Sequence, residues 1–195
     1  MRSVRVIPAL LLKNDGLVKT VKFKNPVYIG DPINAIKIFN EKEVDELVFL
    51  DMEITRKGGE PDYKLLQEFA SEAFFPLAYG GGISSLEQAK RIFRIGVEKI
   101  VLSSAAISNP ELVKEIANHA GSSSVVVCID VKKSVLGTHK IFNRNGEKLQ
   151  NPNPFDMAKS MQELGAGEII VNSVDLDGTM SGYDYELIRK MKDAV

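Results

Sequence analysis

Several features typical of secreted or membrane proteins are missing from this sequence. It contains one cysteine, Cys128, so no internal disulfide can form, and this residue lies in an apolar run where a small thiol is readily buried. No apolar stretch approaches the ~20 residues that a membrane-spanning helix requires. The short apolar run at residues 6–12 meets Lys13, Asn14 and Asp15 instead of a signal-peptide cleavage site. We therefore expect a soluble protein of the reducing cytoplasm.

An excess of charge of one sign is missing as well. The formal net charge of -1 provides no basic field that would attract a nucleic acid or an anionic membrane. Hydrophobic residues make up 44% and charged residues 26% of the 195 residues, which is typical of a folded domain, and no stretch reads as a flexible junction. We expect a single domain with no nucleic-acid or membrane partner, in which any anion site is local.

Short aliphatic runs alternate with amphipathic helical patterns along the whole chain. This alternation is typical of βαβ units and of a parallel sheet that is buried on both faces, so the predicted class is α/β. The predicted strands cover residues 5–12, 46–51, 76–79, 99–102, 125–130 and 168–173. Helix starts are marked by Asp31-Pro32, Ser85 with Gln88, Asn109-Pro110 and Asn153-Pro154, and helix ends by Gly96 and Gly165. Six βα units result, the sixth helix covering residues 183–194.

Two connections are longer than the others, at residues 13–30 and 131–152. Each alternates enough to contain a small hairpin. Both follow a predicted strand, and the loops that follow parallel strands form the face where α/β proteins bind their ligands. We expect the working face of the protein there.

A run of three glycines, Gly80, Gly81 and Gly82, follows the third predicted strand and leads into a capped helix. Backbone N–H groups without side chains can approach an anion closely at such a point, so the run indicates a phosphate site, with a plain tight turn as the equal alternative. Ser103 and Ser104 follow the next strand and offer hydroxyl donors, which favours phosphate. Turn formation is the alternative for these two serines.

Two aspartates end predicted strands of the buried type. Asp51 and Asp130 are not needed there for packing, and a buried carboxylate is costly unless it is paired or solvated, so a function is favoured over a capping role. Asp130 in particular is a candidate general acid or base. Asp177 lies in an acidic loop that does not complete a calcium-binding pattern. His119 and His139 are expected at the surface, so no metal and no cofactor are predicted.

Charged residues stand at the starts of four predicted strands. The pattern permits a ring of charges at the end of the sheet opposite to the working face, and ordinary solvated charge is the alternative. The four residues are Arg5, Glu46, Lys99 and Glu168.

Six sequence blocks together resemble the cyclase subunit of imidazole glycerol phosphate synthase, over essentially the whole chain. They are Ile7-Pro8, Gly30-Asp31-Pro32, residues 45–51, residues 80–83, residues 165–169 and residues 175–184. The resemblance implies a TIM-type (β/α)8 barrel that receives ammonia from a glutaminase subunit docked at its N-terminal face. It also implies a phosphorylated small-molecule ligand.

The resemblance assigns roles to individual residues. It places Asp130 as a catalytic residue and Arg5, Glu46, Lys99 and Glu168 as the gate through which ammonia enters the barrel. It places Gly81, Gly82, Ser103 and Ser104 in one phosphate site. Lys19, Asp51 and Asp177 are further candidates on the active face.

Two departures from the family pattern stand out. The family uses an aspartate at the end of strand one, where this chain has Leu11, which cannot transfer a proton. Residues 8–12 and 19–23 resemble instead a paralogous branch linked to sugar amidation for surface polysaccharide. The second departure is length: such barrels need ~250 residues, so we expect the 195-residue domain to be C-terminally incomplete, without units seven and eight.

Three functions therefore compete. The first is a conduit that delivers ammonia for sugar amidation, favoured by the gate charges and by Leu11. The second is the cyclase of histidine biosynthesis, favoured by Asp130 and the other blocks. The third is the related phosphoribosyl-formimino isomerase, which needs no ammonia gate and ranks last.

Overall fold

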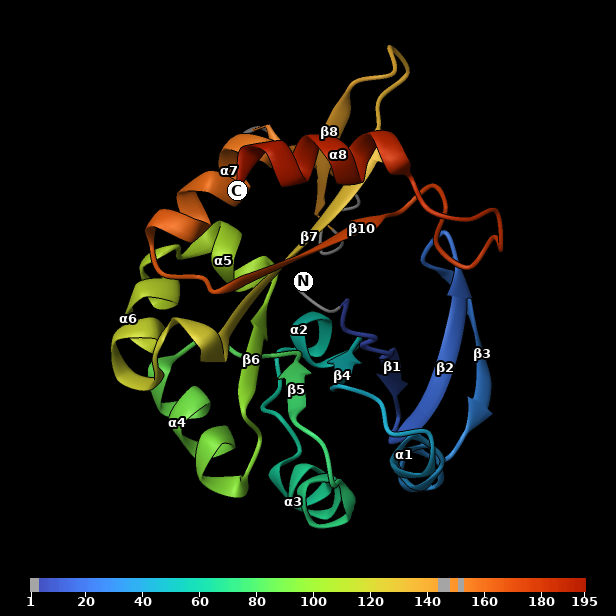
Figure 1. The fold of residues 1–195 in the computed structure, drawn as a ribbon, viewed down its shortest axis with the longest axis vertical. Coiled ribbons are helices and arrows are strands. Elements are labelled where there is room, and N and C mark those ends of the chain that lie inside the picture. The colour runs from blue at the N-terminus through green and yellow to red at the C-terminus, as the bar shows by residue number, and fades with distance from the viewer. Residues whose placement is uncertain (1–3, 144–147, 151–152) are drawn as a thin grey trace. The chain divides into compact units, whose positions relative to one another are not determined.

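The computed structural model describes residues 4–143, 148–150 and 153–195 (Figure 1). These residues form two compact units. The first comprises Met1–Lys19 and Val27–Val101, and the second comprises Thr20–Pro26 and Leu102–Val195. All six predicted strands are present, and each is followed by at least one helix before the next of them begins. The predicted α/β class is confirmed.

The first unit is built on four neighbouring parallel strands. They are β1 (Ala9–Lys13), β4 (Leu47–Asp51), β5 (Leu77–Gly80) and β6 (Lys99–Leu102). The register aligns Leu10 with Phe49, Phe49 with Tyr79 and Tyr79 with Ile100. Strand β1 also pairs antiparallel with β2 (Gly16–Val21), which continues into β3 (Lys24–Gly30). The hairpin predicted within residues 13–30 is therefore confirmed.

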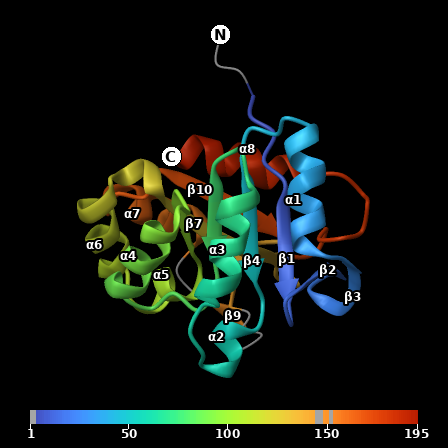
Figure 2. The ribbon, with the colours of Figure 1, turned by 90° about the horizontal axis from the view of Figure 1, so that it is seen from below.

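Three helices of ten residues accompany these strands: α1 (Pro32–Glu41), α3 (Tyr63–Glu72) and α4 (Leu86–Ile95), with the short α2 (Ile54–Lys57) preceding α3. Figure 2 shows α1 and α3 running alongside β1 and β4. The predicted caps of α1 and α4 are confirmed, because Asp31 accepts the N–H of Asn34 at 2.9 Å and Ser85 accepts that of Gln88 at 3.3 Å. Phe49 and Phe69 stack with their ring centroids 4.4 Å apart, which joins α3 to the sheet in the core.

The second unit contains the parallel pair β7 (Val125–Lys133) and β10 (Glu168–Ser173), aligned from Val126 with Glu168 to Val131 with Ser173. Strand β8 (His139–Asn143) pairs antiparallel with β7, and β9 (Lys148–Gln150) pairs with β8. The hairpin predicted within residues 131–152 is confirmed, although residues 144–147 and 151–152 lie outside the described residues. Its helices are α5 (Ser104–Ser108), α6 (Glu111–Ala120), α7 (Pro154–Glu163) and α8 (Tyr185–Ala194), with a 3-10 turn at Ser122–Ser124.

Some predicted boundaries differ from the observed ones for identifiable reasons. Strand β1 begins at Ala9 instead of residue 5, and Pro8 just before it has no N–H to give to a ladder. Strand β7 extends to Lys133 because β8 supplies antiparallel partners for its last residues. The predicted cap Asn109 does not bond α6 through its side chain; its backbone instead closes α5 by donating to Ala105.

The tip of the β2–β3 hairpin is held by the loop that follows β10. The Asp177 carboxylate accepts hydrogen bonds from the Thr20 hydroxyl at 2.9 Å and from the Phe23 N–H at 3.0 Å. The Asp177 carbonyl accepts a third bond from the Lys22 N–H at 2.9 Å. Gly178 follows with φ +66°, and a Cβ there would collide with the Thr20 carbonyl oxygen. The close approach of two backbones therefore requires glycine at position 178.

We predict that Gly178→Ala destabilises the protein far more than Gly182→Ala in the same loop. Both glycines have positive φ, but a Cβ on Gly182 meets no atom within 4 Å. Gly182→Ala should lower the free energy of unfolding by only about 1–2 kcal/mol, which is the cost of a non-glycine residue in the left-handed conformation. Gly178→Ala should lower it by a further amount of about 1–3 kcal/mol, because the new Cβ collides with the Thr20 carbonyl oxygen. Urea denaturation followed by circular dichroism measures both, and equal losses of stability would contradict the predicted collision.

Candidate functional site

Three charged residues meet at the N-terminal ends of the parallel strands of the first unit. Glu46 directly precedes β4, Lys99 opens β6, and Arg5 precedes β1. One Glu46 carboxylate oxygen lies 2.5 Å from the Lys99 ammonium and 3.3 Å from the Arg5 guanidinium. We call Arg5, Glu46 and Lys99 the gate cluster. The structure thus brings together three of the four residues predicted as an ammonia gate.

The gate cluster is buried unevenly. The side chains of Glu46 and Lys99 are 3% and 13% exposed, whereas that of Arg5 is 47% exposed. A carboxylate at this depth is tolerable only because cations compensate it. Glu46 and Lys99 therefore form the buried part of the cluster, and Arg5 covers it from the solvent side.

Glu168, the fourth predicted gate residue, opens β10 in the second unit. It is half-buried and aligned in register with Val126. It shares with the gate cluster its position at the start of a parallel strand.

The predicted glycine loop follows β5 and packs closely against the end of β4. Gly81 and Gly82 have φ of +137° and +67°, and a Cβ on Gly81 would lie 2.6 Å from the Cβ of Asp51. Asp51 itself accepts the backbone N–H groups of Glu53 at 2.8 Å and Ile54 at 3.2 Å. Burial raises the pKa of Asp51 above its ordinary value, against the lowering effect of these two bonds. One oxygen of Asp51 is thus used to order the loop after β4.

The two serines of the predicted phosphate site follow β6 and belong to the second unit. Ser103 occupies the position before α5, but its hydroxyl makes no capping bond, and Ser104 is the first residue of that helix. Both are half-buried. Gly81 and Gly82 lie in the first unit, and Ser103 and Ser104 lie in the second. A phosphate site formed by all four residues therefore stays a prediction.

Asp130 lies on β7, where β10 supports it. Asn172 of β10 is its partner in register and donates a hydrogen bond from its side-chain amide to the Asp130 carboxylate at 3.2 Å. Sequence reasoning missed Asn172, although a polar residue within an aliphatic strand was available as a signal. Leu11, by contrast, is a half-buried hydrocarbon on β1 that pairs with Leu50 and Val18.

Asp177 and Lys19 occupy very different environments. Asp177 is tied to the hairpin tip as described above, whereas Lys19 is an exposed residue of β2.

Asp177 and Asp184 also line a pocket of about 250 Å³ in the second unit. The other lining residues are Val171, Asn172, Ser173, Leu176, Gly178, Gly182, Tyr183, Leu187 and Ile188.

The expectation that His139 lies at the surface is wrong. Its side chain is 4% exposed and faces Asp184, because β8 folds back onto β7 and carries the ring inward. His119 is an exposed residue of α6, as expected.

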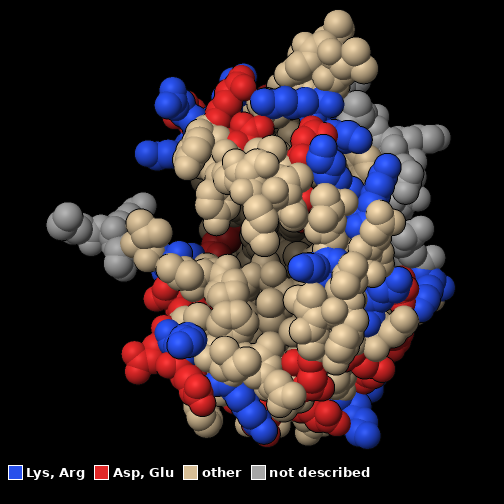
Figure 3. All heavy atoms as spheres, turned by 90° about the vertical axis from the view of Figure 1, so that its right-hand side faces the viewer, with Lys and Arg blue, Asp and Glu red and all other residues tan. Residues whose placement is uncertain are grey.

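Acidic and basic side chains are interspersed on the face drawn in Figure 3. Among the helices within the described ranges, none combines the length and apolarity needed to cross a membrane.

Residues 5–195 match the family described as Histidine biosynthesis protein. A Vibrio vulnificus protein provisionally assigned as imidazole glycerol phosphate synthase subunit hisF3 is 52% identical over all of this chain and 75% of that protein. The chain belongs to the HisF family. A HisF-family protein of Leptospira interrogans, also provisionally assigned, is 51% identical over 98% of this chain and 76% of its own length. The imidazole glycerol phosphate synthase subunit HisF of Exiguobacterium sibiricum is 38% identical over all of this chain and 78% of its own length.

Membership of the HisF family agrees with the alternation of strands and helices described above. Together they confirm the predicted TIM-type (β/α)8-barrel class, of which the described residues contain six βα units.

We predict that Glu46→Gln lowers the free energy of unfolding of this HisF-family chain by about 3–5 kcal/mol, because it removes a buried negative charge that compensates the Lys99 ammonium. The matched control is Glu87→Gln, which breaks a 2.6 Å pair with Lys90 at a side chain that is 76% exposed. The control should cost less than about 1 kcal/mol. Urea denaturation compares the two variants, and similar small losses in both would mean that the gate cluster is not desolvated.

Proposed function

We propose that this HisF-family chain conducts ammonia from a glutaminase subunit to an acceptor reaction, within a glutamine-dependent amidotransferase system that modifies a sugar for surface polysaccharide. The observation that carries the proposal is Leu11, a hydrocarbon on β1 where the resemblance to the cyclase leads us to expect a catalytic aspartate. Its neighbours in register, Val18 and Leu50, are aliphatic too. No proton can be transferred from this part of β1.

The loss of one proton-transfer group has a large kinetic effect. General acid–base groups typically contribute ~10²–10⁴-fold to a rate. Asp15, near Leu11 in sequence, is exposed in the turn between β1 and β2 and has a positive φ of 59°. A carboxylate held in that turn is a poor substitute for one on a strand, so cyclase turnover by this chain should be severely reduced.

The gate cluster supports the transport part of the proposal. An isomerase does not need a buried carboxylate between two cations at the starts of its strands, whereas a path for ammonia needs a polar constriction. In the observed arrangement the Lys99 ammonium closes on Glu46. Ammonia would pass when this pair separates, and a glutaminase docked at the N-terminal face would supply it.

The glycine loop supports a phosphorylated ligand at the opposite face. Positive φ at Gly81 and Gly82 turns the backbone sharply at the end of β5, just before α4. Backbone N–H groups at such a turn suit a phosphate. Ser103 and Ser104 offer hydroxyl donors that suit a phosphate as well.

The named relatives are all described as subunits of imidazole glycerol phosphate synthase, two of them provisionally. Identity is 52% and 51% to the two provisionally assigned relatives and 38% to the subunit HisF of E. sibiricum. A second candidate function, the cyclase of histidine biosynthesis, is favoured by one observation. Asp130 is oriented by the amide of Asn172, as a general acid or base would need to be.

The deciding experiment uses the complete reading frame and measures turnover of the bisphosphorylated ribulosyl-formimino substrate of the cyclase with excess ammonium salt, which removes the need for a glutaminase. We expect negligible turnover by the natural protein and a gain of ~10²-fold or more in Leu11→Asp, because the variant restores a proton-transfer group. Leu11→Asn is the control, having the same shape without acidity. Normal turnover by the natural protein would establish the cyclase and overturn the proposal.

A second experiment tests the gate. In a complex with its glutaminase, we expect Arg5→Gln to lower glutamine-supported amidation by about tenfold, since a hydrogen bond to a charged group is worth roughly 1.5–3 kcal/mol. Amidation supported by free ammonium should be unchanged. Arg91→Gln, which removes a 60% exposed arginine of α4, is the control. Equal loss with glutamine and with ammonium would contradict a gating role.

A further inference from the structure

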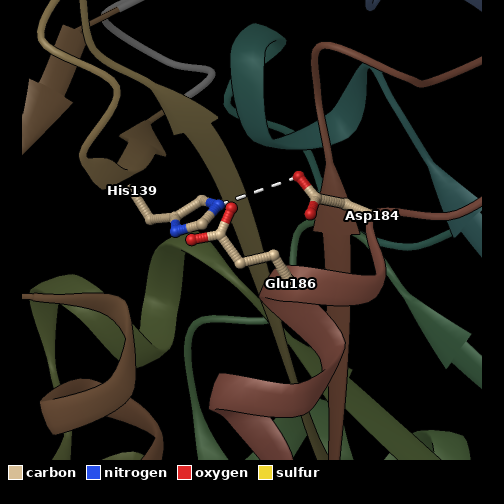
Figure 4. A group of neighbouring side chains, drawn as sticks. All are labelled: His139, Asp184 and Glu186. Carbon is tan, nitrogen blue, oxygen red and sulfur yellow. Dashed lines mark ion pairs between the residues drawn. The ribbon is translucent and has the colours of Figure 1, made fainter.

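One side-chain cluster lies outside every role assigned so far. His139 opens β8, Asp184 caps the N-terminus of α8, and Glu186 lies in the first turn of that helix. Figure 4 shows the three side chains converging from these two elements. One ligand-type atom from each lies within 4.8 Å of the other two, and the His139 Nε2 is 3.7 Å from an Asp184 carboxylate oxygen.

Among the three side chains, the imidazole of His139 has the most unusual environment. Its Nε2 is buried and, among the described residues, has no hydrogen-bond partner. The ring is fixed in place, because Phe155 packs against it edge-on at a centroid distance of 6.0 Å. A buried polar atom without a hydrogen-bond partner destabilises the folded protein. A ligand that uses this nitrogen would remove that destabilisation.

The two carboxylates are oriented by their other contacts. One oxygen of Asp184 accepts the Leu187 N–H at 3.0 Å as the helix cap, and its second oxygen faces His139. One oxygen of Glu186 accepts the Lys190 ammonium at 2.8 Å. Outer hydrogen bonds of this kind hold metal ligands in position.

We propose that His139, Asp184 and Glu186 form a binding site for a divalent transition-metal ion, with Zn²⁺ as the ion that fits best. One imidazole nitrogen and two carboxylate oxygens are a donor set that Zn²⁺ accepts, at bond lengths of about 2.0–2.2 Å. Bonds of that length place tetrahedral donors roughly 3.4 Å apart, close to the observed 3.7 Å between His139 and Asp184. Glu186 is 57% exposed, so a fourth position would be open to water.

Lys133 is the side chain that would compete with a metal ion for the two carboxylates. Its ammonium lies 3.5 Å from both Asp184 and Glu186 and neutralises them when no ion is bound. The side chain is 41% exposed on a flexible stem, so it can move into solvent when a metal replaces its charge. The lysine is therefore a competitor for the site, and removing it should strengthen metal binding.

The test is calorimetric titration of the full-length, chelator-treated protein with ZnCl₂, together with the visible absorption spectrum of the Co²⁺ form. We expect one bound ion and the intense bands of tetrahedral Co²⁺. Lys133→Gln should bind Zn²⁺ about tenfold more tightly, and His139→Gln at least tenfold more weakly. Asp184→Asn should also weaken binding, while it keeps the helix cap, since Asn caps as well as Asp. The control His119→Gln alters an exposed histidine and should bind as the natural protein does.

Three results would overturn the proposal. Undiminished Zn²⁺ binding in both His139→Gln and Asp184→Asn would place the ion elsewhere. Weaker binding in Lys133→Gln would remove the competition argument. Weak octahedral Co²⁺ bands would indicate an adventitious ion only. None of these results depends on ammonia transfer, so they bear on the metal site independently of the proposed function.

Discussion

The carboxylate of Glu46 is the charge on which the N-terminal edge of the first unit depends. It stands at 3% exposure directly before β4, between the ammonium of Lys99 and the guanidinium of Arg5. The neighbouring Asp45 carboxylate accepts the backbone N–H of Val6 at 2.6 Å, so two consecutive acidic residues hold the segment that precedes β1. These contacts join the starts of β4 and β6 to the segment that precedes β1.

Parallel pairing divides the working parts of the molecule between two edges. Because strands β1, β4, β5 and β6 share one direction, their starts collect the gate cluster, and their ends collect Asp51 and the glycine loop. In the second unit, β7 and β10 likewise bring Asp130 and Asn172 together by register alone. Strand register therefore brings side chains that are far apart in sequence within reach of one another, and their ion pairs and hydrogen bonds form on that basis.

Local sequence patterns predicted the strands and helix caps that depend only on neighbouring residues in the chain. Aliphatic runs located β6 and β10 to the residue, and the cap of α1 at Asp31 followed from its side chain and the adjacent proline. These patterns did not predict the environment of a side chain whose contacts come from residues far away in the sequence. His139 read as a surface residue because nothing near it in sequence reveals that Phe155 and Asp184 enclose it. Asn172 was overlooked for the same reason, since its importance comes from its alignment with Asp130 across two strands.

The attachment of the hairpin tip to Asp177 has a consequence for the order of events during synthesis. Thr20 and Phe23 leave the ribosome early, yet their hydrogen-bond acceptor lies 157 and 154 positions later in the chain. Until that loop emerges, the hairpin tip must rely on water or on transient partners to satisfy its backbone. Contacts of such long sequence separation slow folding because the intervening chain has to be closed into a loop first. This hairpin is thus synthesised well before the loop that secures its tip.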